Sequence, residues 1–167
     1  YYNTNGVSVA YTAWDVSKVT SMLGTFAFLT VFNQPLDNWN TSNVTNMCGM
    51  FYSCGAFNSS INTKSTTINS TSYIAWDTKN VVNMSKMFNH ACVFEQDIDK
   101  WNTDSVTNMN SMFSSAVVFN SDIQTKNVTV SNTSYIAWDI KNVESFNNTF
   151  QQAARFTFDI SNWNTSS

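Results

Sequence analysis

Six tryptophans divide the chain into segments of two alternating lengths. They are Trp14, Trp39, Trp76, Trp101, Trp138 and Trp163. The intervals between successive tryptophans are 25, 37, 25, 37 and 25 positions, which gives a full 62-residue period. A fixed period of this kind is typical of repeat architectures, in which each unit buries its apolar side against its neighbours. We therefore expect residues 1–167 to form a single repeat solenoid.

Apolar residues recur at fixed distances, here called offsets, after each tryptophan. Valine stands at offset 5, methionine or phenylalanine at offset 8, phenylalanine at offsets 12 and 18, and leucine or isoleucine at offset 22. The positions expected in the core include Trp39, Val44, Met47, Phe51, Phe57, Ile61, Trp76, Phe88, Phe94, Trp101, Phe113 and Phe119. Offsets 5, 8, 12 and 15 match the stripe of an amphipathic helix. Each repeat is therefore expected to hold one helix and one short strand, which gives an α/β solenoid.

The 37-residue repeats exceed the 25-residue repeats by an insertion, at about 62–75 and 124–137. Both insertions are rich in threonine, valine and isoleucine, alternate in polarity, and end in Ser-Tyr-Ile-Ala before a tryptophan. Alternation of this kind predicts a projecting β-hairpin or an added strand.

The surface is expected to carry little charge, because only 11% of residues are charged, against roughly 25% in ordinary soluble domains. Asparagine, serine and threonine take their place, and a surface of this kind favours an assembly over an isolated monomer. A net charge of −3 gives no basic surface for nucleic acid. No apolar run approaches the roughly 20 residues of a membrane span.

The repeat resembles a known family. The segments 39–47 (WNTSNVTNM) and 101–109 (WNTDSVTNM), together with Met50-Phe51, are similar to the BspA-like bacterial surface-protein repeat, which has about the length of the shorter interval here. That repeat occurs in mycoplasma lipoproteins and in surface proteins of microbial eukaryotes. The resemblance implies a right-handed, leucine-rich-repeat-like solenoid displayed on a surface, with adhesion or scaffolding as its typical role and no enzyme activity.

No catalytic or cofactor site is predicted. His90 is the one histidine, and no cluster of cysteine or acidic residues stands beside it in the sequence. The methionine column (Met22, Met47, Met84, Met109) has helical spacing, which favours core packing over a soft-metal site. Aspartates at offset 21 (Asp97, Asp122, Asp159) are compatible with a calcium column, but hydrogen bonds within turns are the preferred interpretation.

Two kinds of covalent modification are considered. Cys48 and Cys92 stand in successive repeats and are candidates for a disulfide, while Cys54 occupies a core column as a buried thiol. The candidate N-glycosylation sites are Asn58, Asn69, Asn127, Asn132 and Asn164. Each lies in an N-x-[ST] sequon, and Asn69, Asn127 and Asn132 lie in the insertions, where exposure is expected. The alternative is that an Asn/Ser/Thr-rich chain produces such sequons by chance.

Two classes of function remain. In the first, the chain is an extracellular structural module that forms or decorates a surface fibre, coat or appendage by end-to-end self-association. Its partners are then copies of itself, joined head to tail or as part of a longer array. In the second, it is a surface adhesin or a module that binds glycans or surface proteins. The terminal repeats favour the first class, because neither resembles the polar cap of an isolated solenoid.

Overall fold

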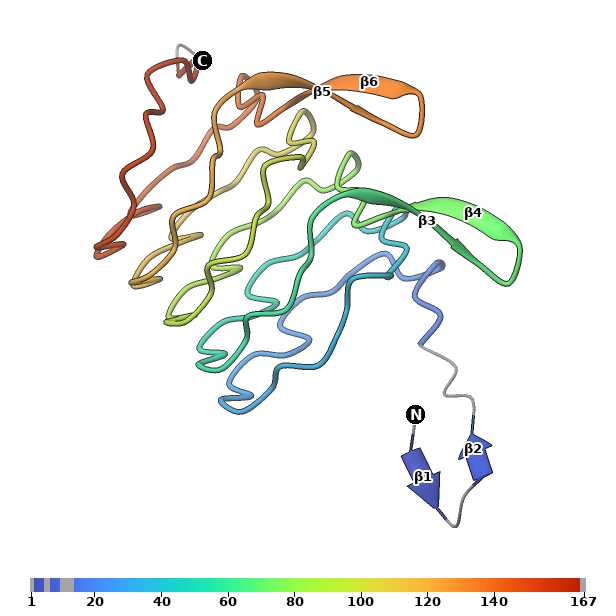
Figure 1. Ribbon diagram of the computed structural model, residues 1–167. Helices are drawn as coiled ribbons and strands as arrows, with labels where there is room; N and C mark the ends of the chain where they lie inside the picture. Colours follow the sequence, from blue (N-terminus) through green and yellow to red (C-terminus); the bar gives the residue numbers. More distant parts are fainter. Residues whose placement is uncertain (1, 5–6, 10–13, 166–167) are drawn as a thin grey trace.

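The computed structural model describes residues 2–4, 7–9 and 14–165 (Figure 1). Its strands are β1 (Tyr2–Thr4), β2 (Val7–Val9), β3 (Lys64–Ile68), β4 (Thr71–Ala75), β5 (Lys126–Val130) and β6 (Thr133–Ala137). They pair as three two-stranded antiparallel sheets, β1–β2, β3–β4 and β5–β6. The described residues contain no helix. The expected fold class, an α/β leucine-rich-repeat-like solenoid, is therefore wrong.

The body of the molecule consists of five turns of chain, here called coils, that lie side by side (Figure 1). Coil 1 is 14–38, coil 2 is 39–75, coil 3 is 76–100, coil 4 is 101–137 and coil 5 is 138–162. Single parallel β-bridges join each coil to the next, through Ser21, Asn46, Asn83, Asn108 and Ser145 in turn. All five bridge residues stand at offset 7, so every coil has the same register.

Backbone hydrogen bonds between coils replace the expected helix. In coil 3, the N–H groups of Met84, Lys86 and Phe88 donate to carbonyl oxygens of coil 4 at 2.8 to 3.0 Å. Between them, the Ser85 N–H donates to the side-chain oxygen of Asn83, and the Met87 N–H donates three residues back to the carbonyl oxygen of Met84. Offsets 10 and 14 adopt positive φ in every coil, for example 57° at Lys86 and 58° at His90. A left-handed residue at every fourth position breaks the i→i−4 pattern of a helix, so alternate N–H groups point to the next coil.

Three columns of stacked rings run through the coils and form the core. The first column holds Phe26, Phe51, Phe88, Phe113 and Phe150, with neighbouring ring centroids 5.6 to 5.7 Å apart. The second holds Phe32, Phe57, Phe94, Phe119 and Phe156, at 5.9 to 6.1 Å. The third holds Trp76, Trp101, Trp138 and Trp163, at 6.1 to 6.4 Å. All twelve positions named above as core are buried.

The insertions are the hairpins β3–β4 and β5–β6, which project from one edge of the stack of coils (Figure 1). The hairpins run from Lys64 to Ala75 and from Lys126 to Ala137, and each accounts for the whole excess of a 37-residue coil over a 25-residue coil. Both turn residues of the first have positive φ, 49° and 64° at Asn69 and Ser70. Positive φ at both central residues is the signature of a type I′ turn, whose twist suits a two-residue hairpin.

Candidate binding surfaces

Each hairpin is fixed at its base to the coil before it. The Tyr73 hydroxyl donates to the carbonyl oxygen of Asn38 at 2.6 Å, and the Tyr135 hydroxyl donates to that of Lys100. Burial raises the pKa of Tyr135 to about 12, because a phenolate would lose hydration there. The equivalent contacts stand one full period apart, so both hairpins are held in the same way.

Lysine–aspartate pairs add to this attachment. The Lys64 ammonium lies 2.6 Å from Asp37, and its equivalent Lys126 lies 3.0 Å from Asp99 and 2.8 Å from Asp122. Burial of Lys126 opposes its charge, but hydrogen bonds to Asp122 and Asp99 outweigh that effect and raise its pKa. The Lys126 ammonium therefore joins β5 to coil 3 through Asp99 and to its own coil through Asp122.

The exposed sides of the hairpins carry matched hydroxyl pairs. Thr67 and Ser72 face each other across β3–β4 with hydroxyl oxygens 2.8 Å apart, and Thr129 and Ser134 do the same across β5–β6. Since the two hairpins repeat the same chemistry, this edge of the molecule presents two copies of one uncharged, hydroxyl-rich surface.

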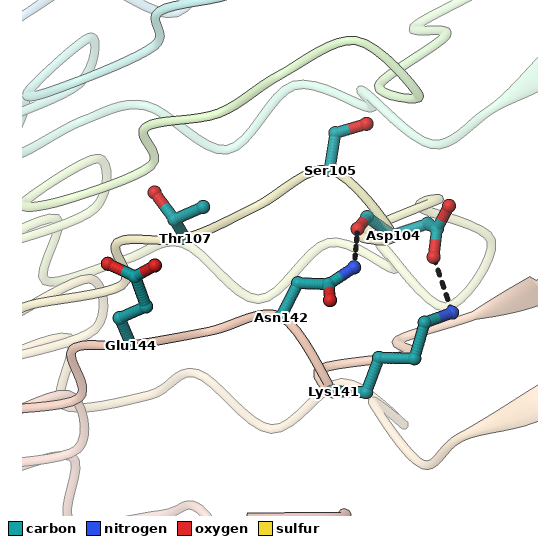
Figure 2. Close-up of a pocket in the computed structure, with 6 residues that line it drawn as sticks. All are labelled: Asp104, Ser105, Thr107, Lys141, Asn142 and Glu144. Atoms are coloured by element: carbon teal, nitrogen blue, oxygen red, sulfur yellow. Dashed lines mark hydrogen bonds and ion pairs between the residues drawn. The ribbon is translucent and has the colours of Figure 1, made fainter. Parts of the chain in front are cut away.

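A polar hollow lies between coils 4 and 5 (Figure 2). It is lined by Asp104, Ser105, Thr107, Lys141, Asn142 and Glu144. The Lys141 ammonium lies 2.6 Å from Asp104 and 2.8 Å from Asp139, and the Asn142 amide donates to the carbonyl oxygen of Asp104 at 2.7 Å. Hydrogen bonds to Asp104 and Asp139 raise the pKa of Lys141. The ion pair and the amide therefore join the two coils to each other, which is a structural role.

The residues that line this hollow are not all repeated one period earlier in the stack. There, Ser42 stands where Asp104 does, and Val82 stands where Glu144 does. Lys79 pairs with Asp77 at 3.2 Å. The sequence pattern did not reveal the hollow, because its residues occupy positions that vary from coil to coil.

An aromatic row, made of Phe28, Tyr52 and His90, crosses the side of coils 1 to 3. The ring centroids of Phe28 and Tyr52 are 4.9 Å apart, and those of Tyr52 and His90 are 6.2 Å apart, both edge to face. Phe28 is 66% exposed. Coils 4 and 5 carry serine and glutamine at offsets 13 and 14, so the row ends at coil 3. Sequence reasoning missed it because those offsets also vary.

The three cysteines are free thiols, so the disulfide considered between Cys48 and Cys92 is not formed. Cys48 stands at offset 9 and lies against its counterpart in the next coil, Ser85, whose hydroxyl donates to the sulfur at 3.2 Å. Cys92 stands at offset 16 and therefore belongs to another column. Cys54 is buried, and burial raises its pKa to about 11.

The five candidate glycosylation sites differ in accessibility. Asn69 and Asn132 occupy the exposed hairpin turns, and Asn127 and Asn164 are also exposed. Asn58 is half-buried, and its side-chain oxygen accepts hydrogen bonds from the backbone of Glu95 and the side chain of Gln96. Asn58 therefore joins two coils, and the hairpin turns are the more open positions.

The described residues hold no group of three or more histidine, cysteine, aspartate or glutamate side chains placed to bind a metal ion. Asp122 and Asp159, at offset 21, each accept a hydrogen bond from a backbone N–H two residues later. Within the same part of the chain, no helix is long and apolar enough to cross a membrane.

Comparison with known proteins gives one family. No curated protein matches the chain, and no solved structure matches it. The model of the family described as "Mycoplasma protein of unknown function, DUF285" matches residues 1–73 and 63–167, which together span the whole chain. The chain therefore belongs to the DUF285 family of mycoplasma proteins.

Proposed function

We propose that this chain is a BspA-like structural repeat module of an extracellular or cell-surface protein, and that it builds or decorates a fibre or coat by end-to-end self-association. One observation carries the proposal. Along offsets 7 to 14 the two sides of every coil are complementary, because N–H groups donate on one side and carbonyl groups accept on the other. Such units add to one another in a single direction without closing, which is the geometry of a filament.

Coils 1 and 5 also have one side that donates through N–H groups and one side that accepts through carbonyl groups. On coil 1 the carbonyl groups that would accept from an earlier coil belong to Ser21, Leu23, Thr25 and Ala27. On coil 5 the N–H groups that would donate to a later coil belong to Phe146, Asn148, Phe150 and Gln152. Among the described residues, none of these eight groups has a backbone partner. Backbone groups of this kind favour pairing with a further coil, which the proposed assembly takes from another copy.

Sedimentation velocity and negative-stain electron microscopy of the purified chain over a range of concentrations test this proposal. We expect particles of constant width whose length and sedimentation coefficient rise with concentration. Particles of one size at every concentration would contradict end-to-end assembly.

A second candidate function, the binding of glycans as an adhesin, is favoured by the aromatic row. Exposed aromatic rings beside hydroxyl and amide groups suit neutral, amphipathic ligands, because such rings combine apolar area with a defined orientation. A printed panel of neutral oligosaccharides tests it. We expect binding that is lost in Tyr52→Ala and Phe28→Ala and kept in Phe158→Ala, which changes an exposed phenylalanine of coil 5. Equal binding by all three variants would exclude the row as the site.

A further inference from the structure

We propose that two copies of this stack associate side by side through the outer edges of β4 and β6, with their hairpins interleaved and antiparallel. The inference rests on the proposed function, because it names the lateral contact that a fibre or coat of such stacks would use. It depends only on the hairpins β3–β4 and β5–β6, which stand one 62-residue period apart. The contact is therefore the same in a stack of any number of periods.

The outer edge of β4 carries backbone groups that are free to pair. Ile68 and Thr71 are paired beside the two-residue turn, so Ser72 and Ile74 stand at the non-hydrogen-bonded positions of the hairpin. The 2.8 Å contact between the Thr67 and Ser72 hydroxyl oxygens agrees with this, because side chains lie closest at such positions. The N–H and C=O groups of Ser72 and Ile74 therefore point away from β3. In the described part of the chain, no other backbone group bonds to them.

The edge of β6 is equivalent, and the space beside it is open. A hollow of about 220 Å³ is lined by Tyr135 and Ile136 from this strand. Successive residues of a strand point to opposite faces, so a hollow that both residues line lies beside the strand edge and not over one face. The rest of its lining comes from the coils, at Asn102, Asp104, Asp139 and Lys141. The space that an added strand needs is therefore present next to β6.

Neither edge has the features that usually prevent strand pairing. Proteins protect exposed strand edges with charged side chains, proline or bulges, but residues 65–75 and 127–137 hold no charged residue and no proline. The pairing within each hairpin runs without a bulge. Lys64 and Lys126 stand at the hairpin bases and are held in ion pairs with aspartates. Both edges are therefore suited to the addition of a further strand.

A second copy of the chain is the partner that fits both edges at once. β4 and β6 have the same sequence, Thr-Ser-Tyr-Ile-Ala, and the hairpins project from one edge of the stack (Figure 1). A two-fold rotation about an axis parallel to the stack brings β4 against β4 of the other copy and β6 against β6. Ser72 then lies opposite Ile74 of the other copy, and each such pair exchanges two N–H···O bonds.

The tyrosines determine the relative direction of the two stacks. The Tyr73 and Tyr135 hydroxyls bond to carbonyl oxygens of the coil before each hairpin, so both side chains lie on the hairpin face that points to that coil. Residues opposite each other across paired strands point to the same face. Tyr73 can therefore lie opposite Tyr73 of the other copy only when the two stacks run in the same direction.

Proline substitutions test which edge forms the contact. Ser72→Pro with Ser134→Pro removes one outward N–H from each of β4 and β6, whereas Thr67→Pro with Thr129→Pro does the same on β3 and β5. Both variants lose the same hydroxyl contacts within the hairpins, so they differ in the affected edge. By negative-stain electron microscopy we expect paired stacks, twice the width of a single stack, for the native chain and for the Thr67/Thr129 control. The Ser72/Ser134 variant should give single stacks.

A cysteine cross-link tests the register. The native thiols are first replaced by Cys48→Ser, Cys54→Ala and Cys92→Ser. Tyr73→Cys then places a thiol where it meets its own equivalent, within the short range that a disulfide requires. Thr66→Cys is the control, because Thr66 lies opposite Tyr73 within the hairpin, on the strand away from the contact. Under mild oxidation, Tyr73→Cys should give at least roughly ten-fold more disulfide-linked dimer than Thr66→Cys.

The outcomes separate this contact from end-to-end assembly. Single-width particles of the native chain, equal pairing by the two proline variants, or equal cross-linking by the two cysteine variants would overturn the hairpin contact. Single stacks that still lengthen with concentration would leave the proposed function in place. Paired particles of fixed length would instead support the hairpin contact and overturn the end-to-end assembly.

Discussion

The indole N–H of Trp101 donates a hydrogen bond to the carbonyl oxygen of Ile61, which lies two coils earlier, at 3.0 Å. The same bond joins Trp76 to Leu36 and Trp138 to Ile98, each at 2.8 Å. Each tryptophan therefore contributes a ring to the core column and a donor to an earlier part of the stack. This double role favours tryptophan at the start of coils 3, 4 and 5.

Replacing Trp101 by Phe should lower the free energy of unfolding by about 2–4 kcal/mol. The change leaves the buried Ile61 carbonyl without its donor and opens a small cavity, and each effect costs of this order. Urea unfolding followed by circular dichroism measures the loss. Trp14→Phe, at an exposed tryptophan, should cost less than about 0.5 kcal/mol. Equal losses in the two variants would show that the Ile61 bond is unimportant.

Phe88 is the central ring of its column, and Phe88→Ala should cost about 3–5 kcal/mol, as for other buried aromatics. Its ring lies 5.6 Å from Phe51, 5.7 Å from Phe113 and 4.2 Å from Phe94. Phe158→Ala removes the same atoms from an exposed site and serves as the control in the same urea titration. A loss below about 1 kcal/mol at Phe88 would contradict a continuous core.

Gly49 tests the left-handed positions. Its φ is 59°, and an added Cβ would meet the Cβ of Tyr52 at an ordinary 3.7 Å. Gly49→Ala should therefore cost about 1–2 kcal/mol from backbone conformation alone. Gly55 has no positive φ, and an added Cβ there lies 3.6 Å from the Thr30 carbonyl oxygen. Gly55→Ala should be close to neutral, so the difference between the two unfolding midpoints isolates the conformational cost.

The raised pKa of Tyr135 predicts that the folded chain loses stability in alkaline solution. Burial raises its pKa from 10.0 to about 12, so the unfolded chain loses this proton at lower pH than the folded chain. The stabilisation is therefore fully present below pH 10 and declines as pH rises towards 12. Urea midpoints of the native chain and of Tyr135→Phe, measured at several pH values from neutral into this window, check it. The difference between the urea midpoints of the native chain and of Tyr135→Phe should narrow with rising pH. A constant difference would contradict the raised pKa of Tyr135.

Deleting hairpin β5–β6, residues 126–137, should leave a folded stack. The deletion joins Thr125 to Trp138 and converts coil 4 to the 25-residue length of coils 1, 3 and 5. Loss of the Tyr135 hydrogen bond and of the Lys126 ion pairs should cost about 1–2 kcal/mol. One cooperative unfolding transition by circular dichroism would support this outcome. Separate unfolding of coils 4 and 5 would show that the hairpin belongs to the core.

Positions that hold the same residue type in every coil predict which side chains stack in columns, but they do not predict the backbone conformation. The tryptophan interval defines the coils, and residues such as Phe51 and Phe88 indicate which side chains share a column. The same spacing also fits a helix, because apolar periodicity records which residues are buried and carries no information on where the N–H groups donate. Glycine at offset 10 in coils 1 and 2, Gly24 and Gly49, was the signal of left-handed turns. Lysine, serine and asparagine at that offset in later coils hide it.

Surface features were harder to predict for a related reason. The aromatic row depends on Phe28, Tyr52 and His90, and the polar hollow depends on Asp104 and Lys141, all at offsets that vary between coils. Only positions that hold the same residue type in every coil stand out in the sequence, and these residues do not occupy such positions. The register between coils is what brings them together, so they can be recognised only after the stack is known.

The hairpins β3–β4 and β5–β6 lie at a fixed spacing along one edge of the stack (Figure 1). They end in the same Thr-Ser-Tyr-Ile-Ala strand and stand two coils apart on one edge (Figure 1). A partner that contacts a single hairpin weakly gains avidity when it spans two, by as much as about 10² to 10⁴ over a single contact. A partner whose two binding sites are not spaced like the two hairpins gains no avidity. The alternation of coil lengths therefore fixes the distance between the two hairpins, and a multivalent partner would have to match that distance.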